Sequence, residues 1–280
     1  MIQRAQLKRH FTALELLGLM IAAICHDLDH RGTNNTFEDL TGSDLSKLYT
    51  TSTMERHHFD MAVIILNCEE NNILINLSVE EYQEVIGTIE HAILATDIGT
   101  YLKVRSEYQT LLDTNTFSWK IQSHRRLAMA MLMTAADLSA ITRPWHTQQR
   151  IAEVVYTEFY EQGDKEREIG HIPAELYDAS NSENLPKMQI GFIDFIGMPV
   201  YVSLAKHFTE LEVIFCIKKV PNATACAHPC SEALAHAVCL LSNRALPRPR
   251  LLGRWLTRPT SVCLFVLPCS LFFAAALVSA

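Results

Sequence analysis

The stretch LELLGLMIAAICHDLDHRG, residues 14–32, decides the fold. Residues 14–25 are apolar except for Glu15, which predicts a helix surrounded by other elements in the centre of a domain. His26, Asp27 and His30 follow at once. Polar side chains at the end of a buried helix need a partner there, because an unpaired buried charge costs several kcal/mol or more.

His26 and Asp27 supply imidazole nitrogen and carboxylate oxygen, the ligands that Zn²⁺ takes in proteins. A structural role is the alternative, because histidine and aspartate often close a helix and bond to loop backbone. Taken alone, the pair His26-Asp27 is a weak motif for metal binding.

Asp137 strengthens the metal hypothesis, because it lies among apolar neighbours in MLMTAADL, residues 131–138. We expect its carboxylate well below the surface, where a bound metal would remove the cost of burying its charge. The alternative is an ion pair with Arg125 or Arg126. These arginines lie about three turns away along the same helix, too far to reach it.

Further polar groups stand where an apolar pattern would not require them, namely Glu55, His57, His58, Thr96 and Asp97. One interpretation is that they hold metal-bound waters and orient the imidazole ligands. The alternative for each residue taken singly is a solvated helix cap or a core histidine with satisfied hydrogen bonds.

Apolar residues recur at helical period through most of the chain up to residue 215, and no run alternates over strand length. The fold class is therefore predicted to be all-α. Ser78-Val79-Glu80-Glu81 is a capping box that starts a helix reaching about Thr96. Further helices are expected over residues 124–141, over 148–162 with Gly163 as the stop, and over 189–208 with a kink at Pro199.

Charge and cysteine content change abruptly near Phe215. Residues 1–215 hold 17 Lys or Arg and 30 Asp or Glu, and residues 216–280 hold seven and one. An acidic body argues against nucleic acid as a partner. Only two of the eight cysteines lie before residue 216, so no disulfide framework is implied and a cytoplasmic location is expected. We predict a domain over 1–215 and a distinct Cys- and Pro-rich basic tail over 216–280.

The tail ends in residues 261–280, a 20-residue stretch without a charged side chain that follows an arginine-rich segment. Such a stretch is long enough to span a bilayer, so a C-terminal membrane anchor is one interpretation. The other is a divergent end without a selected role, which the loss of helical pattern and Pro268 inside the run favour.

Taken together, these segments resemble the catalytic domain of the class I cyclic nucleotide phosphodiesterases, and more closely the cGMP-hydrolysing subset. The resemblance covers about Leu7 to Phe215. It is carried by HDLDHRGTNN from His26, MERHHF from Met54, ILATD from Ile93, MLMTAADLSAITRPW from Met131, EFYEQGD from Glu158 and LPKMQIGFIDFI from Leu185.

The resemblance implies a compact multi-helix phosphohydrolase domain of HD type with two divalent metals, normally Zn²⁺ and Mg²⁺, with Mn²⁺ as an alternative. His26, Asp27 and Asp137 match ligands of the tighter site, and Asp27 would bridge both metals. The waters of the second metal would be held by residues that match His30, Glu55, Thr96 and Asp97.

The resemblance also implies a nucleotide pocket. Gln189 matches the glutamine that bonds the purine, with Gln148 nearby. Phe192 and Val155 match the apolar clamp around the ring. Without the resemblance, ordinary core would be the simpler interpretation of Phe192 and Val155.

Two departures from the family pattern stand out. An H-N-x-x-H segment, which supplies a general-acid histidine and a further zinc ligand in the family, is absent from residues 1–280, and His10 lacks its surroundings. The domain is therefore expected to be incomplete at its N-terminal end, with the tail replacing the last helices. The expected function is hydrolysis of 3′,5′-cyclic nucleotides, cGMP ahead of cAMP. The alternative is a catalytically silent form that binds nucleotide or partner subunits, as a homodimer or with regulatory domains.

Overall fold

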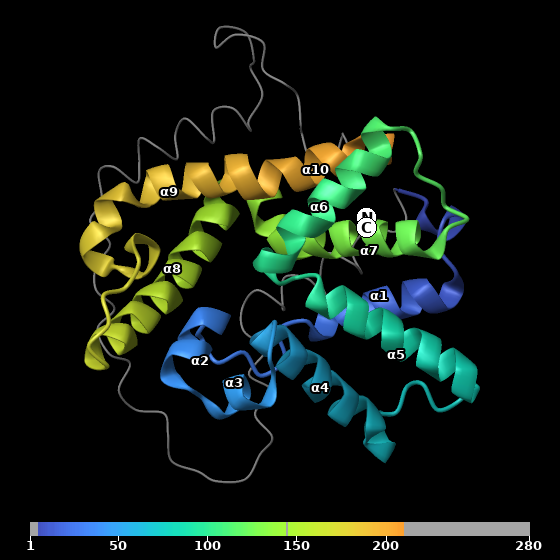
Figure 1. The fold of residues 1–280 in the computed structure, drawn as a ribbon, viewed down its shortest axis with the longest axis horizontal. Coiled ribbons are helices and arrows are strands. Elements are labelled where there is room, and N and C mark those ends of the chain that lie inside the picture. The colour runs from blue at the N-terminus through green and yellow to red at the C-terminus, as the bar shows by residue number, and fades with distance from the viewer. Residues whose placement is uncertain (1–4, 144, 210–280) are drawn as a thin grey trace, which may run out of the picture.

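The computed structural model describes residues 5–143 and 145–209, and in these ranges it contains ten α-helices with short 3₁₀ turns and no strand (Figure 1). The all-α prediction is confirmed. The helices are α1 (Ala13–Cys25), α2 (Asn35–Thr41), α3 (Asp44–Leu48), α4 (Thr53–Asn67), α5 (Val79–Leu94), α6 (Ile98–Asp113), α7 (Gln122–Asp137), α8 (Trp145–Glu168), α9 (Leu185–Phe192) and α10 (Met198–Ala205).

Helix α1 lies between α5 and α7, as its apolar sequence predicts (Figure 1). It begins at Thr12, whose hydroxyl accepts from the backbone N–H of Glu15, while the Glu15 carboxylate accepts from the N–H of Thr12. This reciprocal capping box satisfies two donors that the first turn leaves open. Ala22 and Ala23 in the second half of α1 are buried, so the helix delivers the residue after its end into the interior.

Two apolar clusters form the core. One joins α1, α4 and α5, and the other joins α6, α7 and α10. Helix α7 contributes Met133 to the first cluster and Met129 and Met131 to the second, and all three side chains are almost fully buried. Helix α7 therefore lies between the two clusters and is fixed from both sides, including its last residue Asp137.

Helix α8 does not end at Gly163, so that prediction is wrong. The helix continues to Glu168, and a Cβ atom at position 163 would overlap the carbonyl oxygen of Tyr177. Glycine is needed here for the close approach of a neighbouring segment, a requirement that helical periodicity does not reveal.

The predicted helix over 189–208 is α9 and α10 with a π-helical turn, Ile193–Gly197, between them. The irregularity thus precedes Pro199, which lies in the first turn of α10 where the missing N–H costs little. The continuous helical stretch Ala179–His207 is long and apolar enough to cross a membrane, yet 39% of its apolar window is buried in the molecule. A core helix has the same length and composition, so this is weak support for a membrane span. Residues 261–280 lie outside the described ranges.

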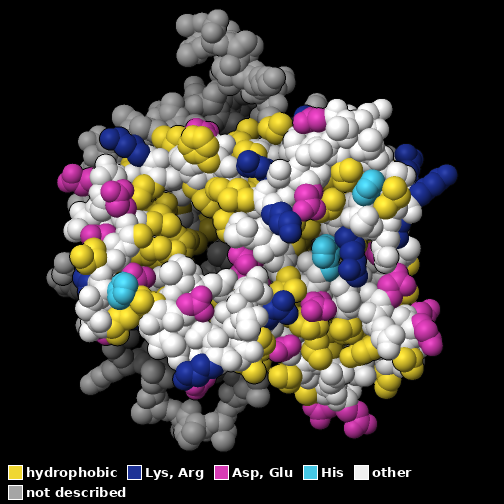
Figure 2. Space-filling view, in the orientation of Figure 1, with side chains coloured by type: hydrophobic (Ala, Val, Ile, Leu, Met, Phe, Trp, Pro, Cys, Tyr) yellow, Lys and Arg dark blue, Asp and Glu magenta, His cyan; other side chains and the backbone are white. Residues whose placement is uncertain are grey.

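The face of the molecule in Figure 2 is hollowed between α8 and the group formed by α2, α4 and α6. Apolar side chains gather on the side of the hollow toward α8 and α9, and carboxylates occur at its opposite rim (Figure 2). A concave surface lined mainly by apolar side chains with a few polar groups is the usual form of a small-molecule site.

Candidate metal centre

The three side chains predicted to bind metal lie together. His26 is the C-cap of α1, Asp27 follows it, and Asp137 is the last residue of α7. The Nε2 atom of His26 lies 3.1 Å from Asp27 Oδ2 and 3.2 Å from Asp137 Oδ1. One ligand atom from each residue falls within 4.8 Å of the others. The ends of two helices therefore place two carboxylates from distant parts of the sequence beside one imidazole.

The group is buried on its imidazole side and open on its carboxylate side. His26 is 2% exposed, whereas the side chains of Asp27 and Asp137 are each 28% exposed. The expectation that Asp137 lies well below the surface is therefore wrong. Its apolar neighbours pack inside the molecule, but Asp137 itself is the last residue of α7 and its side chain is partly exposed beside His26. Catalytic metal sites keep such an open side for water or substrate.

His26 and Asp27 shift each other's pKa values. Burial alone would lower the pKa of His26, but the hydrogen bonds and negative charges of Asp137 and Asp27 outweigh it and hold this pKa well above its usual value. Burial alone would raise the pKa of Asp27, but His26, then His30 and His58, hold this pKa well below its usual range. The arrangement concentrates negative charge beside an imidazole whose Nδ1 is 3.2 Å from the carbonyl oxygen of Ala23.

The donor set fits a divalent metal. One imidazole nitrogen and two carboxylate oxygens suit Zn²⁺, Mg²⁺ and Mn²⁺, and they are fewer than the four ligands of a closed structural zinc site. The Ala23 carbonyl lies beside Nδ1, so Nε2, which lies beside the two carboxylates, is the nitrogen that would face a metal. The roles of His26, Asp27 and Asp137 as ligands stay a prediction.

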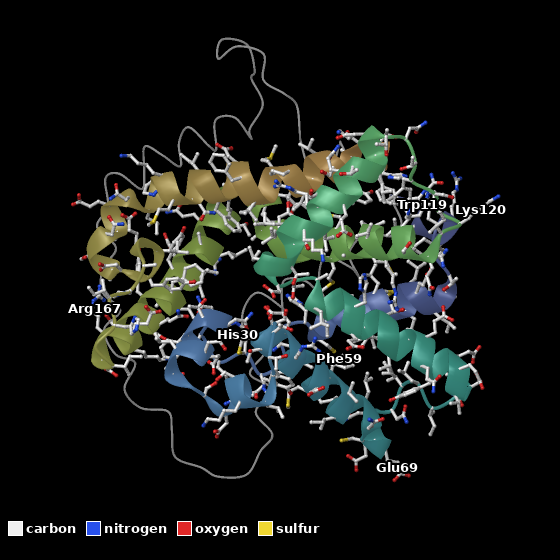
Figure 3. All side chains as sticks on the ribbon, in the orientation of Figure 1. His30, Phe59, Glu69, Trp119, Lys120 and Arg167 are labelled. Atoms are coloured by element: carbon white, nitrogen blue, oxygen red, sulfur yellow. The ribbon has the colours of Figure 1, made fainter. Side chains whose placement is uncertain are left out.

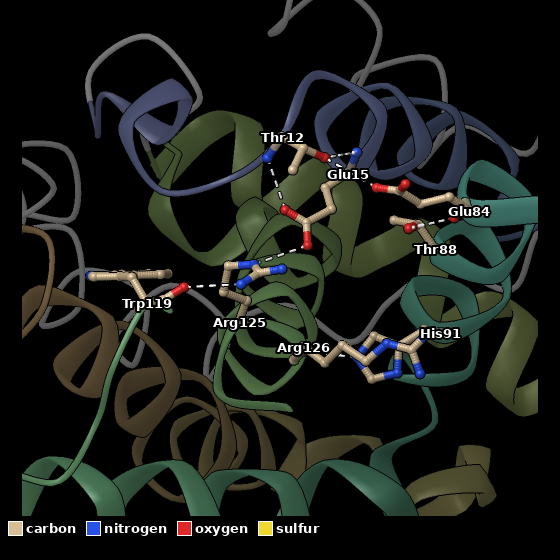
Figure 4. A network of polar contacts seen from close by, with 8 residues as sticks. All are labelled: Thr12, Glu15, Glu84, Thr88, His91, Trp119, Arg125 and Arg126. Atoms are coloured by element: carbon tan, nitrogen blue, oxygen red, sulfur yellow. Dashed lines mark hydrogen bonds and ion pairs between the residues drawn. The ribbon is translucent and has the colours of Figure 1, made fainter. Parts of the chain in front are cut away.

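Arg125 does not pair with Asp137, which removes one alternative for that carboxylate. Its Nε donates to Glu15 Oε1 at 3.0 Å and its Nη1 donates to the carbonyl oxygen of Trp119 at 3.0 Å. Figure 4 shows this ion pair joining α7 to the start of α1. Glu15, the single charged residue of the buried helix, is thus satisfied at the opposite end from the metal group.

Glu55 and Asp97 are held by two residues that the sequence did not indicate. Asn35 donates from Nδ2 to Glu55 Oε2 at 2.9 Å, and Ser52 donates from its hydroxyl to Asp97 Oδ2 at 2.6 Å. Burial raises the pKa of Glu55, and the charge of Asp97 raises it further while that of His30 lowers it. These effects place Glu55, Asp97 and His30 in one electrostatic neighbourhood.

The histidines near the site make specific contacts. His58 donates from Nδ1 to the carbonyl oxygen of Leu28 at 2.6 Å, and its ring stacks on that of His30 at 5.6 Å between centroids. His57 bonds to Asp29, a residue with positive φ, at 2.8 Å. His30 Nδ1 also lies 3.6 Å from a carboxylate oxygen of Glu158 on α8. In Figure 3 His30 lies between α2 and α8.

The residues predicted for the nucleotide come from α8 and α9. Tyr156 of α8 donates to Gln189 Oε1 on α9 at 3.0 Å, which orients the Gln189 amide. Gln148 is buried, and Val155 and Phe192 are half-buried. Helix α8 thus carries Gln148 and Val155 as well as Glu158, which approaches His30 on the metal side.

Thr96, which follows α5, donates from its hydroxyl to the carbonyl oxygen of Ile93.

Asn35, Ser52, Tyr156 and Glu158 were missed by the sequence reasoning. Asn35, Tyr156 and Glu158 lie in or beside the family motifs, but their partners are remote in sequence, so spacing alone does not reveal the contacts. Ser52 lies beside the MERHHF motif and was not distinguishable from an ordinary loop serine.

Comparison with known proteins shows which family the chain belongs to. Residues 1–218 match the 3′5′-cyclic nucleotide phosphodiesterase family. The cGMP-specific 3′,5′-cyclic phosphodiesterases of Drosophila virilis and Drosophila melanogaster are each 47% identical over 216 residues, or 77% of this chain. The chain covers 24% and 19% of the length of these two curated relatives. It belongs to the 3′,5′-cyclic nucleotide phosphodiesterase family, whose members are metal-dependent.

Proposed function

We propose that this chain carries the metal- and nucleotide-binding part of an enzyme that hydrolyses 3′,5′-cyclic nucleotides to 5′-monophosphates, cGMP ahead of cAMP. The observation that carries the proposal is His26 Nε2 within 3.2 Å of carboxylate oxygens of both Asp27 and Asp137. Family membership supports the reaction, and relatives that are described as cGMP-specific support the choice of nucleotide.

Two divalent metals are the proposed cofactors, Zn²⁺ and Mg²⁺, with Mn²⁺ as an alternative to Mg²⁺. His26, Asp27 and Asp137 would hold the tighter one. When bound, the metals would lower the pKa of a water and stabilise negative charge on the phosphate oxygens.

The chain's own residues would position water and substrate. His30, Glu55 and Asp97 would hold metal waters by hydrogen bonds, and the bonds from Asn35 to Glu55 and from Ser52 to Asp97 fix two of these carboxylates. Because burial raises the pKa of Glu55, its proton can be held or released nearer to neutral pH than that of an exposed carboxyl group.

The purine would lie against α8 and α9. Gln189 would bond the base through the part of its amide that Tyr156 leaves free, with Gln148 nearby. Phe192 of α9 and Val155 of α8, both half-buried, would cover the ring faces. Apolar contact plus a few oriented polar groups is the usual composition of a small-molecule site.

Hydrolysis is tested with two versions of the chain, one of 280 residues and one extended upstream by an H-N-x-x-H segment. Release of 5′-GMP is followed with zinc and magnesium supplied. We expect the extended version to be faster by about 10²–10⁴, because a general acid typically contributes that much. In the extended version, Asp137→Ala should abolish the gain and Asp113→Ala, an exposed residue of α6, should keep it. Equal turnover in the two parent versions would show that the catalytic machinery is misassigned.

Nucleotide binding is tested by Gln189→Ala. Loss of its paired polar contacts should weaken binding by about 1–3 kcal/mol, measured by calorimetry with cGMP and with cAMP. Gln83→Ala, at an exposed position of α5, is the matched control and should bind as the parent does. Unchanged affinity of the Gln189 variant for both nucleotides would remove this residue from the pocket.

A second candidate is a catalytically silent chain that binds nucleotide or partner subunits, as a homodimer or with regulatory domains. Nucleotide binding without 5′-GMP release by the 280-residue chain would favour this candidate.

Three further proposals rest on composition alone. They are the cytoplasmic location, the domain boundary at residue 215 and, as one of two interpretations, a membrane anchor over 261–280.

A further inference from the structure

We propose that Gln162 is a positioning residue for the metal centre, because it fixes residues 31–35, here called the 31–35 loop, against helix α8. The inference rests on the proposed function, since it concerns how the metal side of that site is held. Gln162 itself would touch neither metal nor substrate. It would act through Asn34 and Asn35.

Gln162 has a buried side-chain amide whose oxygen and nitrogen are both hydrogen-bonded. It is 2% exposed, its Oε1 accepts from the backbone N–H of Asn34 at 2.9 Å, and its Nε2 donates to Glu166 Oε1 at 2.8 Å. A backbone N–H can only donate and a carboxylate can only accept, so the two partners require an amide in this orientation. A glutamate here would place its carboxylate against that of Glu166.

Asn34 is held a second time through its side chain. Its Oδ1 accepts from the N–H of Phe37 and caps α2, while its Nδ2 donates to the hydroxyl of Tyr177 at 2.8 Å. The backbone of Tyr177 in turn lies against α8 at Gly163, so closely that any Cβ there would overlap it. Helix α8 therefore holds the 31–35 loop in two ways, directly by the hydrogen bond to Gln162 and indirectly through Tyr177, which packs on α8 and bonds to Asn34.

The 31–35 loop connects these contacts to residues on the metal side. Asn35 accepts the N–H of Met54 at 2.8 Å and donates to Glu55 at 2.9 Å, so it sets both the start of α4 and the Glu55 carboxylate. At the other end, the N–H of Gly32 donates to His30 Nδ1 at 3.0 Å. Gly32 has φ of 69°, a conformation that favours glycine and lets its N–H turn toward His30.

Helix α8 also carries Gln148 and Val155, which the proposed function assigns to the nucleotide. The Gln162 contact thus fixes the helix that bears the nucleotide residues to the loop that orients Glu55 and His30. Groups one layer behind metal ligands typically change metal affinity or activity by about 10–100-fold when they are removed. Gln162 reaches Glu55 only through Asn34 and Asn35, so it lies at least two contacts further out and an effect no larger than the lower end is expected.

The test measures how tightly the purified 280-residue chain, saturated with zinc, binds Mn²⁺ as the second metal, by electron paramagnetic resonance of the free ion. Glu55 and His30 would hold the waters of this second metal, so Gln162→Leu should weaken Mn²⁺ binding by up to about tenfold. The control is Gln149→Leu, because Gln149 of α8 makes the same contact with a glutamate four residues on, Nε2 to Glu153 Oε1 at 3.1 Å, without touching the 31–35 loop. Both variants lose one such pair, and only the first should lose Mn²⁺ affinity. Amide hydrogen exchange over residues 31–35 should rise in the first variant alone.

Three outcomes separate the inference from the proposed function. Mn²⁺ affinity lowered by Gln162→Leu and unchanged by Gln149→Leu supports the positioning role. Parent-like Mn²⁺ affinity in Gln162→Leu, together with loss of zinc in Asp137→Ala, overturns the positioning role and leaves the proposed function standing. Parent-like zinc binding in Asp137→Ala overturns the proposed function and this inference with it. If Gln162→Leu does not fold, Tyr177→Phe removes only one hydroxyl and should weaken Mn²⁺ binding about threefold, and unchanged affinity there overturns the inference.

Discussion

His58 shows at the scale of one residue how the site depends on burial. Its ring is 2% exposed, donates to the carbonyl oxygen of Leu28 and stacks on His30. Burial lowers its pKa to about 4, from an ordinary value of 6.5. His58 is therefore neutral at pH 7 and contributes an oriented ring and one hydrogen bond rather than a charge.

The lowered pKa of His58 predicts acid sensitivity. The unfolded chain takes up the proton below about pH 6.5 and the folded chain only below about pH 4. The contribution to stability is therefore complete above pH 6.5 and is lost as the pH falls toward 4. Between pH 7 and pH 4.5 the metal-free parent should lose about 2–3 kcal/mol more of its free energy of unfolding than His58→Asn, which keeps an N–H donor. Denaturant unfolding at both pH values measures this, and an equal loss in the two proteins would contradict it.

The sequence predicted which residues gather at the site better than it predicted their surroundings. The apolar neighbours of Asp137 identified an unusual carboxylate, and the structure places it beside His26. Its exposure was misjudged, because the position of a helix end relative to the surface depends on the packing of the whole domain. The contacts of Asn35 and Ser52 join residues 20 and 45 positions apart, and no local pattern encodes them.

The packing of α1 on α5 is the contact between elements that supports the site most directly, because α1 ends at His26. At Gly18 the two helices approach so closely that a Cβ would lie 2.8 Å from the Cβ and Cγ2 atoms of Thr88. Close packing here fixes the axial position of α1, and with it the distance of His26 from the end of α7.

Gly18→Ala should therefore destabilise the protein by about 1–3 kcal/mol, because the added methyl group overpacks the α1–α5 contact. Gly87→Ala on α5 is the matched control. Its nearest atom would be Arg126 Nη2 at 3.9 Å, so the better helix propensity of alanine should leave stability equal or raise it by about 0.5–1 kcal/mol. Thermal and denaturant unfolding report the difference, and equal effects of the two substitutions would refute the packing argument.

The start of α5 was predicted more accurately than the other helix boundaries. The capping box at Ser78 begins α5 as expected, because its signal is local and chemical. The end of α8 was misplaced, because Gly163 does not cap the helix. A side chain at position 163 would overlap the backbone of Tyr177, and this close contact requires glycine. The break between α9 and α10 is a π-helical turn that precedes Pro199, and no single residue type marks such a turn.

At the scale of the whole molecule, two apolar clusters meet at α7, and the ends of α1 and α7 bring His26, Asp27 and Asp137 together. Apolar side chains border the hollow of Figure 2 on the side of α8 and α9. The all-α fold followed from helical periodicity. The face on which the helix ends meet could be anticipated only from the family resemblance, because periodicity does not fix how helices pack.

The central claim is that His26, Asp27 and Asp137 form a metal site. Anomalous diffraction at the zinc edge, from crystals of the chain grown with zinc, tests it most directly. We predict a peak in contact with His26 Nε2 and with the carboxylates of Asp27 and Asp137, and its loss in Asp137→Ala. Crystals saturated with zinc that show no peak between these three side chains, or the same peak in Asp137→Ala, would contradict the claim.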